Sequence, residues 1–280
     1  CLIANFYCPD STNRPKPAHR KDCGARRASS DLPRGFHLRL HGRSTISHRC
    51  HRAYHAPITK ANFSKNELGG IMSVLTLKDV IYSYTDGTSN VLNGINYQFE
   101  KGRFYAIVGS SGAGKSTLLG LLAGLDTPTG GQILFDDQDI AEQGYSHHRK
   151  HNISLVFQNY NLIDYLTPLE NLKLVNSKAT NETLHSMGLD DDHIHRNVMK
   201  LSGGQQQRVA IGRALVSHAP IILADEPTGN LDETTAADII DILRRAAHEN
   251  DKCVIVVTHS KQLAKEADVV LKLKDKKLKA

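Results

Sequence analysis

The chain has 280 residues, of which 40% are hydrophobic and 23% charged, so it can bury a sizeable core in one large or two modest domains. No apolar run approaches the roughly 18 residues of a membrane-spanning helix, which predicts no direct membrane insertion. The net charge of +6 is confined to residues 1–71, where 13 basic and 4 acidic residues give +9, while the other 22 basic and 25 acidic residues give −3. We therefore expect no nucleic-acid partner for the rest of the chain.

Residues 1–71 show neither helical nor alternating periodicity, so we expect a disordered leader. A basic arm for nucleic acid or lipid is an alternative. A zinc site is another, although the usual ligand spacing is missing from its candidates Cys23, His48, Cys50 and His51. Residues 67–72, Glu-Leu-Gly-Gly-Ile-Met, can be back-translated into a ribosome-binding sequence followed by a start codon. We favour a leader that is not native, with residues 72–280 forming the protein proper, although Gly-Gly is equally compatible with a linker.

The first part of the body predicts β structure. Residues 74–80 alternate between apolar and polar side chains, and residues 91–99 continue as another strand after a polar turn. Together they indicate an antiparallel β subdomain. Tyr84 is a candidate for stacking on an adenine ring, although strand tyrosines more often only pack against neighbours.

Residues 109–117 match the phosphate-binding loop pattern G-x-x-x-x-G-K-[ST] in its required context. The apolar run 104–108 before the loop reads as a buried strand, and residues 118–123 after it read as a helix. The loop backbone and the helix N-terminus attract phosphate oxygens, Lys115 would reach the β and γ phosphates, and the Ser116 hydroxyl would bind Mg²⁺. The nucleotide-binding candidates in this loop are Gly109, Ser110, Ser111, Gly112, Ala113, Gly114, Lys115, Ser116 and Thr117.

Short strands are predicted at 132–135 and 153–158, followed by a helical insert at about 159–200, where leucines recur at helical spacing. Ser202 is a plausible N-cap for the next helix, and the glycines after it offer a second anion cradle. Taken alone, this segment is more often a capped helix start. Gly212 interrupts that helix and should cost about 1 kcal/mol relative to Ala.

Two later strands end in polar residues. The apolar run 221–224 leads into Asp225 and Glu226, where Asp225 can hold Mg²⁺ and Glu226 can polarise a water for attack on the γ phosphate. The run 252–258 leads into His259, at the strand end where α/β sheets place ligand contacts, although a lone histidine is more often structural. Cys253 in this strand is the only cysteine outside the leader, which fits a reducing compartment.

These motifs, taken in order with Gln158 and residues 201–205, make residues 73–280 resemble an ABC-type ATPase, the nucleotide-binding subunit of an ABC transporter. The finer pattern is most similar to the lipoprotein-release, macrolide-export and antimicrobial-peptide-resistance branch. The resemblance implies an α/β P-loop NTPase fold with a mixed β core, an antiparallel β subdomain and a small α-helical subdomain. A proline that many relatives carry before Leu201 is missing here.

The resemblance also implies roles for individual residues. Tyr84 is similar to the aromatic that stacks on adenine, and Gln158 to the glutamine that senses Mg²⁺ and the γ phosphate beside the helical insert. Asp232 resembles an aspartate that acts across a dimer, and His259 a histidine that holds the γ phosphate. The signature residues, which would contact the γ phosphate bound by the other subunit, are Ser202, Gly203, Gly204 and Gln205.

The implied function is hydrolysis of ATP with Mg²⁺ by a homodimer that powers an integral membrane permease, for export of lipophilic compounds, peptides or lipoproteins, or for peptide sensing and resistance. The protein would then be cytoplasmic and peripheral, attached to the inner face of the membrane through the permease. One alternative is a regulatory ABC ATPase of the cell-division type. A soluble relative acting on ribosomes or DNA fits poorly, because the sequence has one P-loop and no basic body.

Overall fold

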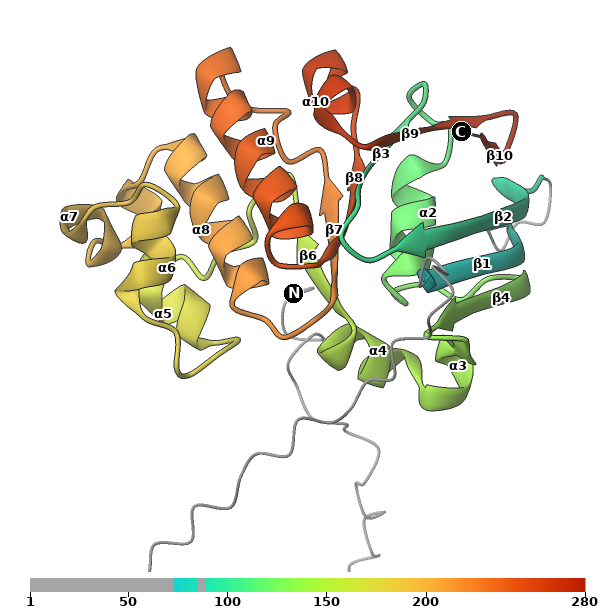
Figure 1. Cartoon of the computed structure of the whole chain (residues 1–280), viewed down its shortest axis with the longest axis horizontal. Coiled ribbons are helices and arrows are strands. Elements are labelled where there is room, and N and C mark those ends of the chain that lie inside the picture. The colour runs from blue at the N-terminus through green and yellow to red at the C-terminus, as the bar shows by residue number, and fades with distance from the viewer. Residues whose placement is uncertain (1–72, 85–88, 280) are drawn as a thin grey trace, which may run out of the picture. The chain divides into compact units, whose positions relative to one another are not determined.

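The computed structural model describes residues 73–84 and 89–279 (Figure 1). The predicted leader, residues 1–71, with its zinc and start-site hypotheses, lies outside these residues. Within them, the larger sheet has the strand order β10-β9-β3-β8-β7-β6. All neighbouring strands in it are parallel except β9 and β10. In sheet order, the strands cover Lys277–Lys279, Val269–Lys274, Phe104–Val108, Cys253–Val257, Ile221–Asp225 and Ile153–Val156.

The parallel strands are buried on both faces, because successive side chains of a strand point to opposite sides of the sheet. In β8, Val254 and Val256 belong to one buried cluster, whereas Cys253, Ile255 and Val257 belong to the other. Burial raises the pKa of the Cys253 thiol far above its ordinary value, so this cysteine behaves as a small apolar core residue.

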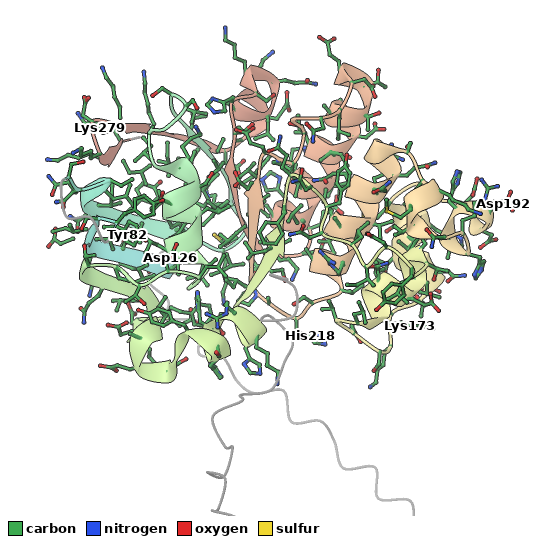
Figure 2. The ribbon with its side chains drawn as sticks, turned by 180° about the vertical axis from the view of Figure 1, so that it is seen from behind. Tyr82, Asp126, Lys173, Asp192, His218 and Lys279 are labelled. Carbon is green, nitrogen blue, oxygen red and sulfur yellow. The ribbon has the colours of Figure 1, made fainter. Side chains whose placement is uncertain are left out.

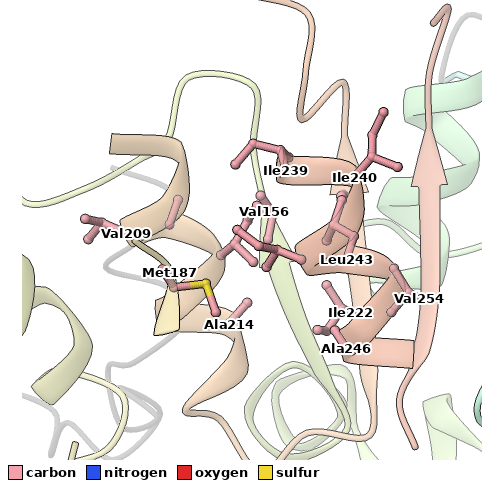
Figure 3. Close-up of a cluster of buried hydrophobic side chains, with 14 of the residues drawn as sticks. Val156, Met187, Val209, Ala214, Ile222, Ile239, Ile240, Leu243, Ala246 and Val254 are labelled. Atoms are coloured by element: carbon pink, nitrogen blue, oxygen red, sulfur yellow. The ribbon is translucent and has the colours of Figure 1, made fainter. Parts of the chain in front are cut away.

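Three helices cover one face of this sheet: α8 (Gly203–Leu215), α9 (Glu233–His248) and α10 (Lys261–Glu266). Figure 3 shows how the apolar face of α9 meets side chains of α8 and of the central strands. Ile239 and Leu243 of α9 are fully buried there, with Val209 of α8 and Ile222 of β7. This cluster positions the start of α8 and the start of α9 relative to the strand ends.

The other face is covered by α2 (Lys115–Leu122) and by residues of a second sheet, whose strand order is β2-β1-β4-β5. All its strand pairs are antiparallel, which confirms the predicted antiparallel subdomain. In sheet order, its strands cover Leu92–Glu100, Ser73–Tyr82, Gly130–Phe135 and Gln138–Asp139. Two short helices then lead to β6: α3 (Ile140–Gln143) and α4 (Tyr145–His151).

A small helical subdomain lies between β6 and α8, as predicted. It contains α5 (Pro168–Lys173), α6 (Asn181–Ser186), α7 (Asp191–Ile194) and a 3₁₀ turn, η1 (Val198–Lys200). Pro168 opens α5, and Thr167 forms a reciprocal capping box with Glu170. Among the helices in the described part of the chain, none has the length and apolar character that crossing a bilayer demands.

Candidate active site

The loop 109–117 connects β3 to α2, in the strand, loop and helix order that the sequence predicts. Gly114 adopts a left-handed backbone with φ of 97°, and a Cβ there would lie 2.9 Å from Cγ1 of Val91. Both the conformation and the space therefore require glycine. At Gly109 a Cβ would lie 2.7 Å from the carbonyl oxygen of Leu273 in β9. The motif glycines thus let this loop pack tightly between β9 and the residue that precedes β2.

Lys115 is held inside this loop and is only 7% exposed. Its Nζ donates to the carbonyl oxygens of Gly109 and Ser110, both at 3.1 Å, and lies 2.9 Å from Nε2 of His259. An ammonium group can only donate, so Nε2 of His259 accepts this hydrogen bond. The arrangement fixes a positive charge at the N-terminus of α2, where an anion is favoured.

The two predicted acids stand at the end of β7 and differ in their surroundings. Asp225 hydrogen-bonds to Ser116. Burial raises the pKa of the Asp225 carboxyl, and the charge of Glu226 acts in the same direction, while Ser116 and Lys115 oppose the rise. A carboxylate and a hydroxyl side by side are the oxygen ligands that Mg²⁺ prefers, so Asp225 and Ser116 fit the predicted magnesium site.

Glu226 is fixed by the neighbouring strand β8. Its backbone N–H donates to the carbonyl of Val257 at 2.9 Å, and its Oε2 accepts from Thr258 Oγ1 and from the backbone N–H of His259, both at 3.1 Å. Glu226 has a φ of 45°, which is uncommon for a residue with a side chain and costs about 1 kcal/mol or more. This strained conformation aims the carboxylate beside His259, whose Nε2 lies 3.6 Å from Oε1.

These groups line one cavity of about 710 Å³. Gln158, which follows β6, lies on its wall, and its Nε2 is 3.5 Å from Oδ1 of Asn230. Tyr84 lies at the cavity with 57% of its surface exposed, and its hydroxyl is 2.9 Å from Thr117 Oγ1. The structure therefore brings together most of the predicted site residues: Tyr84, Ser111, Gly112, Gly114, Lys115, Ser116, Thr117, Gln158, Asp225, Glu226 and His259.

The remaining residues of the loop 109–117 do not line the cavity but hold the loop and Lys115 in place. Gly109 and Ser110 supply the carbonyls that hold Lys115, and Ala113 donates its backbone N–H to Ser110 at 3.2 Å. Sequence reasoning missed Val91, Gly229 and Val257 as wall residues. Val91 and Val257 carry no chemical signal, because they contribute only apolar surface at the ends of strands.

The signature residues and Asp232 are not part of this cavity. Ser202 caps α8, and its hydroxyl accepts from the backbone N–H of Gln205 at 3.3 Å. Asp232 caps α9 in the same manner, accepting from the N–H of Thr235 at 3.0 Å and from its hydroxyl at 2.7 Å. The start of α8, with Gly203 and Gly204, therefore does not contribute to the cavity around the P-loop of its own chain.

Comparison with known proteins agrees with this geometry. The sequence pattern of the family described as ABC transporter matches residues 92–229. The uncharacterized ABC transporter ATP-binding protein YclH of Bacillus subtilis is 42% identical over 212 residues, which cover 72% of this chain and 94% of YclH. The lipoprotein-releasing system ATP-binding protein LolD of Acinetobacter baylyi is 39% identical over 219 residues, covering 72% of this chain and 95% of LolD. This similarity confirms the predicted subfamily resemblance.

A solved structure is similar as well. It is a dimeric post-hydrolysis state of the ATP-binding cassette MJ0796, from Methanocaldococcus jannaschii, bound to ADP and Pi. Its TM-score with this chain is 0.65 at 36% identity, and the match covers 74% of this chain and 97% of that chain. The fold predicted from the sequence is thereby confirmed.

Proposed function

This chain belongs to the ABC transporter family and is an ATP-binding ATPase, and on that premise we propose that two copies clasp two ATP molecules and thereby power a membrane permease. One observation carries the dimer. The cavity of a single chain contains the P-loop, both acids, Gln158 and His259, while the signature start of α8 lies outside it. A second copy placed head to tail brings its signature to this cavity and completes it.

Within the complete site, Lys115 binds the phosphates and Glu226 orients the attacking water and accepts its proton. Thr258 and the backbone N–H of His259 keep the Glu226 carboxylate in place for that task. His259 lies between Glu226 and Lys115, where a γ phosphate can replace the lysine as its partner when Nε2 of His259 carries the ring proton and donates it. Ser116 and Asp225, with Gln158 nearby, would hold Mg²⁺, which would supply positive charge beside the phosphate oxygens.

Coupling to the permease runs through the helical subdomain. Gln158 lies on the cavity wall and begins the segment that leads into α5 and α6, so a change of contacts at the nucleotide reaches the subdomain directly. Loss of the γ phosphate releases the two chains, and their separation moves the permease. LolD, named for lipoprotein release, favours export of lipophilic molecules, peptides or lipoproteins as the transported class. The protein then sits peripherally on the inner face of the membrane.

Glu226→Gln tests the dimer. The amide keeps the shape of the side chain but cannot accept a proton, so we expect ATP binding to persist, steady hydrolysis to stop and a stable dimer to form in ATP and Mg²⁺. Light scattering and cross-linking measure the dimer. A Glu226→Gln protein that stays a single chain in saturating nucleotide, with and without its permease, contradicts the proposal.

Lys115→Ala is the control, because it should weaken ATP binding and so prevent the dimer at the same ATP concentration. The membrane partner is identified separately, by purifying the protein from detergent-solubilised membranes. A co-purifying permease supports transport, whereas co-purifying cell-division proteins contradict it.

A further inference from the structure

A chain of polar contacts connects α7 to the signature start of α8. Oδ1 of Asp190 lies 2.5 Å from Nδ1 of His193. On the other side of the ring, Nε2 of His193 lies 2.8 Å from Nε2 of Gln205. Oε1 of Gln205 in turn accepts a hydrogen bond from the backbone N–H of Ser202 at 2.9 Å. Four residues from two helices thus connect a surface carboxylate to the first residue of the signature.

The geometry determines the hydrogen-bonding roles between His193 and Ser202. Gln205 must turn its oxygen toward the N–H of Ser202, so its NH₂ group faces His193 and donates. Nε2 of His193 therefore accepts, which leaves the ring proton of a neutral imidazole on Nδ1, close to Asp190 but without a hydrogen-bond partner among the described residues. The backbone N–H of His193 holds the pKa of the Asp190 carboxyl below its ordinary value, which keeps this carboxyl negatively charged beside the imidazole.

The elements that carry these side chains are themselves anchored. Ile194, next to His193, is fully buried in the core, and the Asp190 carboxylate caps α7 through the N–H of His193 at 2.9 Å. The His193 side chain is 28% exposed, whereas the Asp190 side chain is 65% exposed. The imidazole is thus held by a fixed backbone against the side chain of Gln205.

We infer that His193 is a positioning residue for the signature, acting through Gln205 to hold Ser202 ready for the γ phosphate bound by a second copy of the chain. This rests on the proposed dimer. A capped, preorganised helix start has less conformational freedom to lose when it closes over an anion, so the contact chain favours association. Without His193, the Gln205 amide loses its external partner and the Ser202 backbone loosens.

A second pair in the same subdomain provides a matched control. Nε2 of His185 lies 3.0 Å from Oδ1 of Asp191, next to Asp190 in the sequence, but no side-chain hydrogen bond or ion pair among the described residues continues from His185 to α8. Figure 2 labels Asp192, which pairs with Arg196 at 3.3 Å and likewise does not reach the signature. Removing the His185 pair therefore changes the local charge without touching Ser202.

The experiment uses the full chain with Glu226→Gln and adds His193→Phe, His193→Gln or His185→Phe. Phenylalanine keeps a ring of similar size but has no nitrogen, whereas the glutamine oxygen can still accept from Gln205. We expect His193→Phe to raise the dimer dissociation constant in ATP by roughly tenfold or more, since each dimer loses the support twice. Affinity of the single chain for ATP should stay unchanged, His193→Gln should recover most of the dimer, and His185→Phe should behave as the parent.

A second measurement does not need the dimer. Hydrogen exchange of the free chain should show faster exchange at the amides of Ser202 and Gln205 in His193→Phe, and not in His185→Phe. Unchanged exchange and unchanged dimerisation in His193→Phe overturn the inference and leave the dimer standing. If His193→Phe loses ATP affinity and dimerisation to the same extent, the inference is also overturned, because His193 then has a general role in folding. If the Glu226→Gln parent itself never dimerises, the proposed function is contradicted instead. The exchange data still test whether His193 supports Ser202 through Gln205.

Discussion

Alanine substitutions at two glycines of α8 should have opposite effects on stability. Gly212 is buried where α8 meets the helical subdomain, and a Cβ built there lies 3.8 Å from a methyl carbon of Leu172 and 3.8 Å from one of Leu184. These are ordinary van der Waals distances, so a methyl group fits without any shift. At Gly204 the same Cβ would lie 2.4 Å from Cγ2 of Thr235, which is closer than atoms can approach.

The magnitudes follow from these contacts. Gly212→Ala gains about 1 kcal/mol of helix propensity, and burial of the methyl group adds up to about 0.8 kcal/mol. Gly204→Ala gains propensity too, but overpacking costs about 1–3 kcal/mol. Thr235 cannot simply turn away, because its hydroxyl donates to Asp232 at 2.7 Å in the cap of α9. We expect a net loss of about 1 kcal/mol for Gly204→Ala.

Thermal and urea unfolding of the full chain, without nucleotide, measure both effects. For a domain of about 200 residues, each kcal/mol shifts Tm by about 2–4 °C, so Gly212→Ala should raise Tm by about 2–7 °C and Gly204→Ala should lower it. A shift of the same sign and size in both variants would refute the reasoning, because it would show that the space around each Cβ does not decide the outcome.

Three further predictions concern the cavity and the core around it. Tyr84→Ala should raise the Kd for ATP about tenfold while Tyr84→Phe keeps it, if stacking rather than the hydroxyl binds the base; equal losses in a fluorescent-nucleotide titration argue against stacking. Thr258→Val removes the hydroxyl that holds Glu226 at 3.1 Å, so kcat should fall about tenfold with ATP affinity unchanged, and an unaltered kcat contradicts that support. Burial acts to raise the pKa of Asp268, but its hydrogen bonds to His248 and to a backbone N–H outweigh this and lower it. The ionised carboxyl of Asp268 therefore stabilises the fold above the unfolded pKa of about 3.9, and this stabilisation is lost as the pH falls through the lower folded pKa. The free energy of unfolding of Asp268→Asn, measured in urea, should be lower than that of the parent at neutral pH and should converge with it in acid.

Motif spacing was sufficient to predict much of the cavity. A glycine loop needs a strand before it and a helix after it, so the position of Lys115 followed from the sequence alone. Asp225, Glu226 and His259 end parallel strands of one sheet, and such ends meet at one edge. Each of these residues is placed by regular backbone, which local patterns describe well.

Other features depend on contacts between distant segments. The left-handed φ of Glu226 is enforced by β8, and the contact between His193 and Gln205 joins segments whose spacing matches no motif. The β9–β10 hairpin went unpredicted although Leu271 and Leu273 alternate with lysines, which is a strand signal. The pairing of β9 with β3 joins residues that are far apart in the sequence, and the local pattern does not determine it.

The attachment of Glu226 to β8 has a consequence for how this enzyme can be tuned. Glu226 directly follows β7, while Thr258 and His259, which hold its carboxylate, directly follow β8, so the alignment of those two strands sets where a water is activated. A core substitution that shifts β8 by a fraction of an ångström, far from any phosphate, would therefore change the rate of hydrolysis while leaving the affinity for nucleotide unchanged.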